Sequence, residues 1–247
     1  MQRSLASLIC VGLAGLSAAA TKIDWSFETS YYNKYVWRGI NFVNEGVLQP
    51  SLTGSWNGWT VNFWGNYDTT DVNTYYGTST GKNRITEWDS TLSRNFDFES
   101  GTGTFGVTHY DFPNTGTAST TEFWANFALK QAFSPYLYVA YDVDETDGFY
   151  AKVGGNYSMP CALVKGANWN LGAWLGYGSE DFNNFWYGNN ESALADYGFD
   201  AKLSYNFTEM TYGTLHLAYT GLMDDGHRAG APNRSNFVFG FGFGAKF

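Results

Sequence analysis

The sequence predicts an all-β protein, a transmembrane, antiparallel, up-and-down β-barrel of about twelve strands. The first observation is the segment 236–247, where Phe237, Phe239, Phe241 and Phe243 alternate with small or polar residues. Because successive side chains of a strand point to opposite faces, these rings share one face. A row of phenylalanines is unfavourable in water, but it suits a strand with lipid on one side and a lumen on the other.

Composition is the second observation. Aromatic residues make up 19% of the chain, charged residues only 15%, and there are 29 glycines. After the amino-terminal segment, no run approaches the roughly 20 apolar residues that a membrane-spanning helix needs. The formal net charge of −9, with 23 acidic against 14 basic residues, disfavours nucleic acid as a partner.

The amino-terminal segment is the third observation. Arg3 precedes an apolar stretch at 5–16, and small residues follow up to Ala20. This pattern is typical of a secretory signal peptide. We therefore expect a cleaved signal peptide at 1–20 and an outer-membrane β-barrel at 21–247.

Alternation of apolar and polar residues places the other strands in order. The first strand is expected at 23–37, with Trp25 and Phe27 outward. Asn57-Gly58 favours a type I′ turn. The remaining strands are predicted at 46–56, 59–68, 85–96, 103–112 (with no clear outward face), 120–131, 136–143, 148–158, 167–178, 196–207, 212–221 and 236–247.

The connections between these strands alternate in length. One set is mostly short, and the other is mostly longer and rich in Asn, Asp, Gly and Thr. Short periplasmic turns and longer external loops are typical of bacterial outer-membrane barrels, which sets the expected location. The external loop at 179–188 carries aromatic and acidic residues, which suit either surface recognition or folding into the barrel mouth. The longer connections are predicted at 38–45, 69–84, 113–119, 144–147, 179–195 and 222–234.

The side chains that face inward predict the properties of the lumen. Large rings would narrow a passage, and an excess of carboxylates would favour cations. The sequence therefore predicts a porin with a narrow, mildly cation-preferring passage for small solutes. The alternative is a closed structural or surface-recognition barrel without transport. The predicted lumen-lining residues are Glu28, Trp64, Glu87, Asp89, Trp124, Lys152, Trp174, Asp200 and Lys202.

Two chemical hypotheses receive little support from the sequence. Asp142, Asp144 and Asp147 precede Gly148 and offer oxygen ligands, but their spacing misses the pattern of a calcium loop. The three histidines of the barrel segment lack the pairing with serine that a barrel hydrolase needs. We therefore expect no metal site, no cofactor and no enzymatic activity.

Four short segments are distinctive: Tyr35-Val-Trp-Arg-Gly39, His109-Tyr-Asp-Phe-Pro-Asn114, Tyr141-Asp-Val-Asp-Glu-Thr-Asp-Gly148 and Leu175-Gly-Tyr-Gly178. Together they resemble the TorF-type porin family, small Gram-negative outer-membrane barrels that are otherwise of unknown function. The resemblance implies a small outer-membrane barrel. A strand that ends on aromatic residues, here Phe243 and Phe247, also resembles the insertion signal of such barrels. The expected partners are outer-membrane lipid, the barrel-assembly machinery and small solutes, and the oligomeric state is left open.

Overall fold

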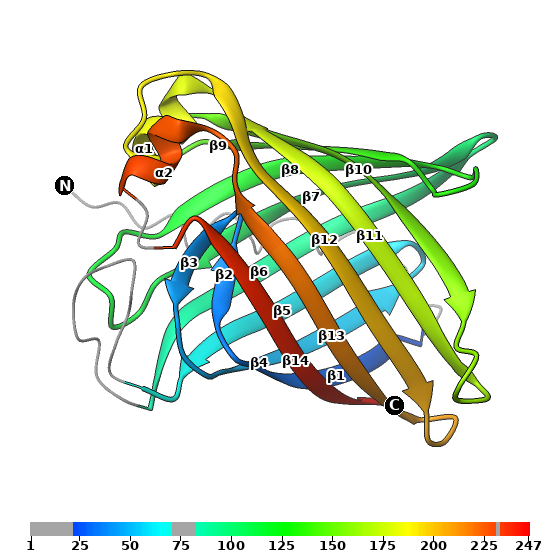
Figure 1. Cartoon of the computed structure of the whole chain (residues 1–247). Coiled ribbons are helices and arrows are strands. Elements are labelled where there is room, and N and C mark those ends of the chain that lie inside the picture. The colour runs from blue at the N-terminus through cyan, green and yellow to red at the C-terminus, as the bar shows by residue number, and fades with distance from the viewer. Residues whose placement is uncertain (1–21, 71–82, 231–232) are drawn as a thin grey trace, which may run out of the picture.

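The computed structural model describes residues 22–70, 83–230 and 233–247, and these form a closed, antiparallel twelve-stranded barrel (Figure 1). The predicted fold class is confirmed. The order around the barrel is β1-β14-β13-β12-β11-β10-β9-β8-β7-β6-β5-β4, so neighbours in the chain are also neighbours in the wall. The predicted signal peptide and most of the predicted loop 69–84 lie outside the described residues.

The bounds of the wall strands agree with the predicted strands to within three residues, except at the end of the first strand. The wall strands are β1 (Asp24–Tyr32), β4 (Val47–Trp56), β5 (Trp59–Asp68), β6 (Arg84–Phe98), β7 (Gly101–Asp111), β8 (Thr120–Leu129), β9 (Tyr136–Asp142), β10 (Phe149–Pro160), β11 (Ala167–Gly178), β12 (Ala193–Asn206), β13 (Thr211–Leu222) and β14 (Ser235–Lys246). The other elements are β2 (Tyr35–Trp37), β3 (Ile40–Val43), α1 (Glu180–Tyr187) and α2 (Asp225–Gly230).

Pairing between β1 and β14 closes the barrel. Phe27 lies opposite Ala245, and Tyr31 lies opposite Phe241. Beyond the last paired residue, Trp25 and Phe247 exchange two backbone hydrogen bonds of 3.1 and 3.0 Å. Closure matters because a strand edge exposed to hydrocarbon would leave backbone groups without partners.

The outer face of the barrel is apolar, as the alternation predicted. Phe237, Phe239, Phe241 and Phe243 of β14 are all exposed, Phe241 by 59%. Strand β7, whose outward face the sequence left undecided, exposes Phe105. A band of exposed apolar side chains around a closed barrel is the surface that a bilayer covers.

The glycine face of β14 makes room for tyrosine side chains of its neighbours. A Cβ atom at Gly240 would lie 2.2 Å from Cδ1 of Tyr32, and one at Gly244 would lie 2.2 Å from Cζ of Tyr212. Any larger residue would push these rings away. The glycines that alternate with the phenylalanine ladder therefore let the rings of β1 and β13 cover the strand from inside.

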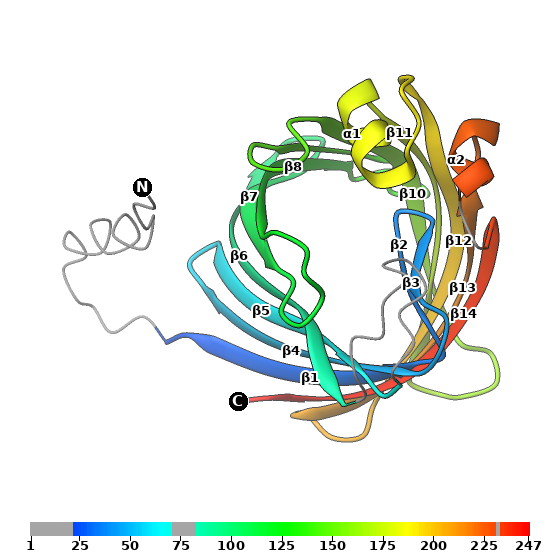
Figure 2. The same cartoon turned by 90° about the vertical axis from the view of Figure 1, so that its left-hand side faces the viewer.

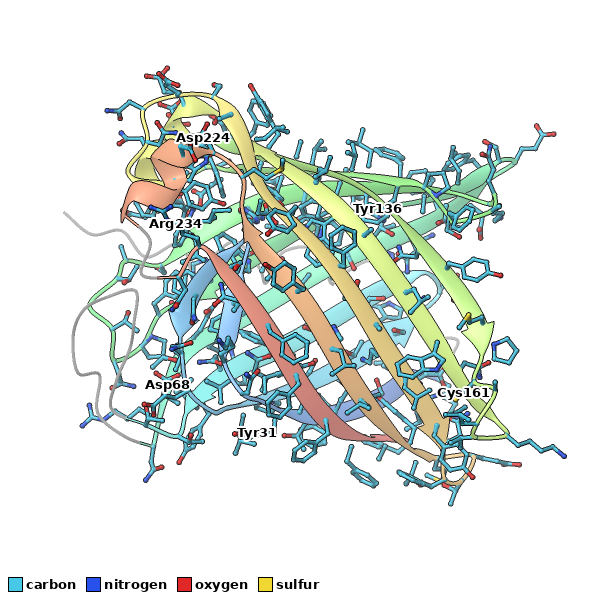
Figure 3. All side chains as sticks on the ribbon, in the orientation of Figure 1. Tyr31, Asp68, Tyr136, Cys161, Asp224 and Arg234 are labelled. Atoms are coloured by element: carbon cyan, nitrogen blue, oxygen red, sulfur yellow. The ribbon has the colours of Figure 1, made fainter. Side chains whose placement is uncertain are left out.

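The two ends of the barrel differ. The turn with Cys161 lies at one end, and the connection with Asp224 and Arg234 lies at the other (Figure 3). We call the second end the mouth, because the longer connections gather there, including α1 and α2 (Figure 1). No helix in the described ranges is both long and apolar enough to cross a membrane.

The prediction of one strand over 23–37 is wrong at its end. Strand β1 stops at Tyr32, and β2 pairs with β3 in a separate two-stranded sheet. A view along the barrel shows this hairpin inside the ring of strands (Figure 2). The predicted loops 38–45, 179–195 and 222–234 contain β3, α1 and α2, respectively.

The outward position of Phe241 gives a test of the membrane assignment. Phe241→Arg should lower the free energy of unfolding in lipid vesicles by about 2–4 kcal/mol, because Phe241 lies near the middle of β14. Phe237→Arg is the matched control: it lies near the mouth, where an arginine costs about 0–1 kcal/mol. Urea unfolding of both variants measures this, and equal losses would contradict the assignment.

Candidate functional site

The tip of the inner hairpin is a two-residue turn. Trp37 lies opposite Ile40, and both turn residues have positive φ, 45° for Arg38 and 79° for Gly39. These angles are those of a type I′ turn, which favours glycine at its second position. A Cβ at Gly39 would also lie 2.7 Å from Leu222 Cδ2 and 3.0 Å from Asp196 Cβ. The tip therefore touches the barrel wall at β12 and β13.

Arg38 joins the hairpin to β8 through a buried ion pair. Its Nη1 and Nη2 donate to Oε1 and Oε2 of Glu122 at 2.7 and 2.9 Å. The side chains are only 8% and 3% exposed, respectively. The Tyr110 hydroxyl also donates to Glu122 Oε2, at 2.9 Å. A buried carboxylate is costly unless it is paired and hydrogen-bonded, and here it is both.

Aromatic rings surround the same guanidinium. Its Cζ lies 4.2 Å from the ring centroids of Trp37 and Tyr150, and 5.2 Å from that of Phe182. Desolvated cation–π contacts of this kind contribute about 2 kcal/mol or more. The guanidinium of Arg38 is thus bound by the Glu122 carboxylate and by cation–π contacts with three aromatic rings.

Helix α1 covers the hairpin from the mouth. Ser179 caps its first turn, and Gly188, with φ of 69°, ends it in the left-handed conformation. Phe182 is fully buried, and Trp186 is 5% exposed. Of the two possibilities for the loop 179–188, the structure shows folding into the mouth. We call the β2–β3 hairpin and α1 together the mouth plug.

Contacts within the mouth plug are aromatic and close. The ring of Trp186 lies 4.9 Å from that of Trp37 and 6.0 Å from that of Phe42. The Tyr187 hydroxyl donates to the Arg38 carbonyl oxygen at 2.9 Å. The hydrophobic core of this barrel therefore lies inside its mouth, between the hairpin, the helix and the ends of the strands.

On one side of the hairpin the carboxylates are buried. Glu87, Glu122 and Asp142 line a void of about 10 Å³ together with Trp37 and Trp186. That is barely room for one water molecule. The carboxylates on this side are part of a packed wall.

On the other side the interior is hollow. A cavity of about 240 Å³ lies between the segment 34–39 and the strands β1, β4, β11, β13 and β14. Lys34, Gln49, Trp174 and His216 are among its lining residues, and no Asp or Glu lines it in the described part of the chain. The hairpin therefore divides the mouth into a packed side, where carboxylates line the void, and an open side, where Asp196 and Asp200 lie behind the lining residues Trp174 and His216.

The residues predicted to line the lumen fall into several separate groups of contacts. Trp64 lies against Tyr35 of the hairpin at 5.7 Å between ring centroids, opposite Asp89 in the β5–β6 register. Two of them face an oppositely charged or basic partner: Lys202 lies 3.5 Å from Glu28, and Asp200 lies 3.6 Å from His216. The indole N–H of Trp124 donates to the Thr108 hydroxyl at 3.0 Å, and Lys152 lies 5.6 Å from the ring centroid of Trp174. Glu87 lines the small void.

Sequence reasoning missed the centre of this arrangement. Arg38 entered only as part of a segment that resembles the TorF-type family, and 38–45 was expected to form an external loop. The sequence does carry a signal: Arg38-Gly39 is a two-residue turn candidate between Tyr35-Val-Trp37 and Ile40-Asn-Phe42. Alternation alone could not show that this hairpin folds into the barrel.

The acidic loop at the mouth does not gather its carboxylates around one point. Asp142 accepts the Thr120 hydroxyl at 2.7 Å and the backbone N–H of Asp144 at 3.0 Å. Asp147 accepts the Tyr141 hydroxyl at 2.6 Å. Asp142 therefore stabilises the turn, and no group of three His, Cys, Asp or Glu side chains within the described ranges is placed to hold a metal ion.

His109, one of the three histidines for which the sequence shows no pairing with serine, lies on the exposed side of β7. Its Nδ1 is 3.0 Å from the Thr121 hydroxyl, and its Nε2 is 3.7 Å from Asp111. Neither contact activates a serine.

A closed, twelve-stranded barrel with an apolar outer face, short turns at one end and longer connections at the other has the fold of the bacterial outer-membrane porins. The solved NanC porin is similar, with a TM-score of 0.52 and 12% identity over 90% of this chain and 100% of that one.

An anion-selective porin from Comamonas acidovorans is more distant, with a TM-score of 0.37 and 10% identity over 92% of this chain and 99% of that one. No protein-family model matches the chain, and no curated protein matches its sequence. The likeness to the NanC porin therefore supports the fold alone.

Glu122→Gln should loosen the hairpin, because it leaves the Arg38 cation buried without a counter-charge. Removing one partner of a buried pair costs about 3–5 kcal/mol, so amide exchange of residues 35–43 should accelerate strongly. The double variant Arg38→Met, Glu122→Gln should lose less amide protection than Glu122→Gln alone, because it leaves no buried charge without a partner. Glu99→Gln, in an exposed turn, is the control. Equal exchange in the Glu99 and Glu122 variants would show that the pair does not hold the hairpin.

Lowering the pH should destabilise helix α1 at the mouth, because His227 on α2 packs against it. Its ring packs edge-on against Tyr187 at 4.3 Å, with Asp224 and Asp196 nearby. Burial lowers the pKa of this imidazole, although the two aspartates oppose the shift. Protonation therefore favours the opened state, so protection of α1 should be full near pH 7 and fall below about pH 6.5.

Amide exchange of α1 between pH 7.5 and 5, corrected for the intrinsic rate, measures this loss of protection. His227→Gln, which cannot titrate, should show a flatter pH profile. The same slope in both proteins would exclude His227 as the cause.

Proposed function

We propose that this barrel is a porin of the bacterial outer membrane, with a narrow, mildly cation-preferring passage for small solutes. The fold supports the location, because closed barrels with an apolar band are suited to that membrane. The relation to the TorF-type porin family belongs to the same proposal.

The cavity of about 240 Å³ beside the hairpin is the observation that carries the proposal. The acidic side of the hairpin is filled, so a solute would pass on the cavity side. A hairpin fixed inside the mouth narrows a twelve-stranded barrel, which would otherwise enclose a wider lumen. A passage restricted in this way would admit small solutes only.

The proposed cation preference depends on inward carboxylates. Asp89 is half-buried, and its Oδ1 has no hydrogen-bond partner in the described part of the chain. Asp200 faces His216 at 3.6 Å and lies on β12, away from the packed acidic side. Most other carboxylates of the mouth are paired or hydrogen-bonded, as Glu122 and Asp142 are, so the preference should be mild.

A closed barrel without transport is the second candidate, and the mouth plug favours it. Phe182, Trp186 and Phe42 are buried in its core, so the plug is not a loose loop. In that case the exposed Phe185 and the connections at the mouth would serve recognition.

Conductance in a planar bilayer separates the two candidates. The refolded protein should give discrete steps, with a reversal potential in asymmetric salt that indicates a small cation preference. Asp200→Asn should move that potential toward zero, because it removes a negative charge beside the cavity.

Asp144→Asn, in an exposed loop at the mouth, is the control and should leave the reversal potential nearly unchanged. A folded barrel that stays silent would contradict the proposed passage and favour the closed barrel. Anion preference in the unchanged protein would contradict the charge assignment alone.

A further inference from the structure

We propose that the cavity beside the hairpin is a binding site for a small, ring-shaped organic anion with one carboxylate, about the size of a monosaccharide. The site adjoins the proposed passage, but binding does not require that the barrel conducts. The inference rests on the charge, the rings and the size of the cavity.

The lining includes the cationic Lys34, and the nearby Asp196 and Asp200 contact other lining residues, Trp174 and His216. Lys34 forms no ion pair with any carboxylate of the described residues, whereas Lys202 is paired with Glu28. No Asp or Glu of the described residues lines the cavity. In a chain with a formal net charge of −9, a hollow with a free lysine and no carboxylate lining is a local exception.

His216 adds a second polar group to the lining. Its Nδ1 is buried and lacks a hydrogen-bond partner in the part of the chain that the structure describes. Its Nε2 lies 3.6 Å from Asp200 Oδ2. A hydroxyl group of the ligand would satisfy Nδ1, because a hydroxyl can both donate and accept, and Lys34 would supply the charge opposite to the ligand carboxylate.

Aromatic side chains give the cavity flat walls. Tyr32, Tyr35 and Trp174 line it, and Tyr32 packs edge-on against His216 with ring centroids 5.7 Å apart. Few polar groups among aromatic walls are typical of small-molecule sites. The volume lies below the range of about 300–1,000 Å³ for drug-sized ligands, so a single-ring solute fits better.

A local anion site is compatible with a mild cation preference of the barrel. Small ions respond to the field of the whole lumen, whereas an organic anion would be held by direct contacts with Lys34 and His216. A bound anion would also partly neutralise the lysine beside the passage.

Isothermal titration of the refolded protein with glucuronate, glucose and glucosamine tests the site. The three probes are related single-ring sugars and differ in charge. Glucuronate should bind more than fivefold tighter than glucose, and glucosamine should bind weakest. Lys34→Gln should weaken glucuronate binding about tenfold, as expected for a lost charged hydrogen bond. His216→Gln should weaken it less.

Lys130→Gln is the matched control, because Lys130 pairs with Asp97 away from the cavity. Equal binding of the three sugars, no binding of glucuronate, or unchanged binding in folded Lys34→Gln protein would overturn the proposal. Glucuronate binding by a barrel that does not conduct would refute the proposed passage and leave the site intact. Conduction without glucuronate binding would refute the proposed site and leave the proposed passage intact.

Discussion

The ion pair between Arg38 and Glu122 is the interaction on which the interior of this barrel depends. It fixes the tip of a hairpin to β8, across the lumen from β12 and β13, which the same tip touches through Gly39. Without it, the buried guanidinium and the buried carboxylate would each need another partner. The position of the hairpin in turn determines which half of the mouth is packed and which is hollow.

The wall and the plug use aromatic residues in opposite ways. Rings on the outer face, such as Phe241, are exposed and suited to lipid. Rings at the mouth, such as Trp37, Phe182 and Trp186, are packed around a cation and form the core. A barrel of this width does not fill its interior with wall side chains alone, so folded connections complete it.

The sequence was sufficient to predict the strands of the barrel wall, but it did not predict the folded hairpin and helix at the mouth. Period-two alternation identified about twelve strands and the lipid-facing residues of most of them, because that period follows directly from strand geometry. It left the outward face of β7 undecided. The position of Arg38 depends on contacts with Glu122, 84 residues away, and local pattern carries no such information. Helix α1 was likewise read as a loop, since its burial depends on the hairpin beneath it.

The conductance of a barrel without residues 35–43 tests the central claim most directly, namely that the hairpin occupies and narrows the mouth. The account predicts that a variant with Lys34 joined to Asn44 through a short Gly-Ser linker folds as a barrel. It should conduct several-fold more than the unchanged protein. Equal conductance of the two folded proteins, or silence of both, would contradict the claim that this hairpin controls a passage.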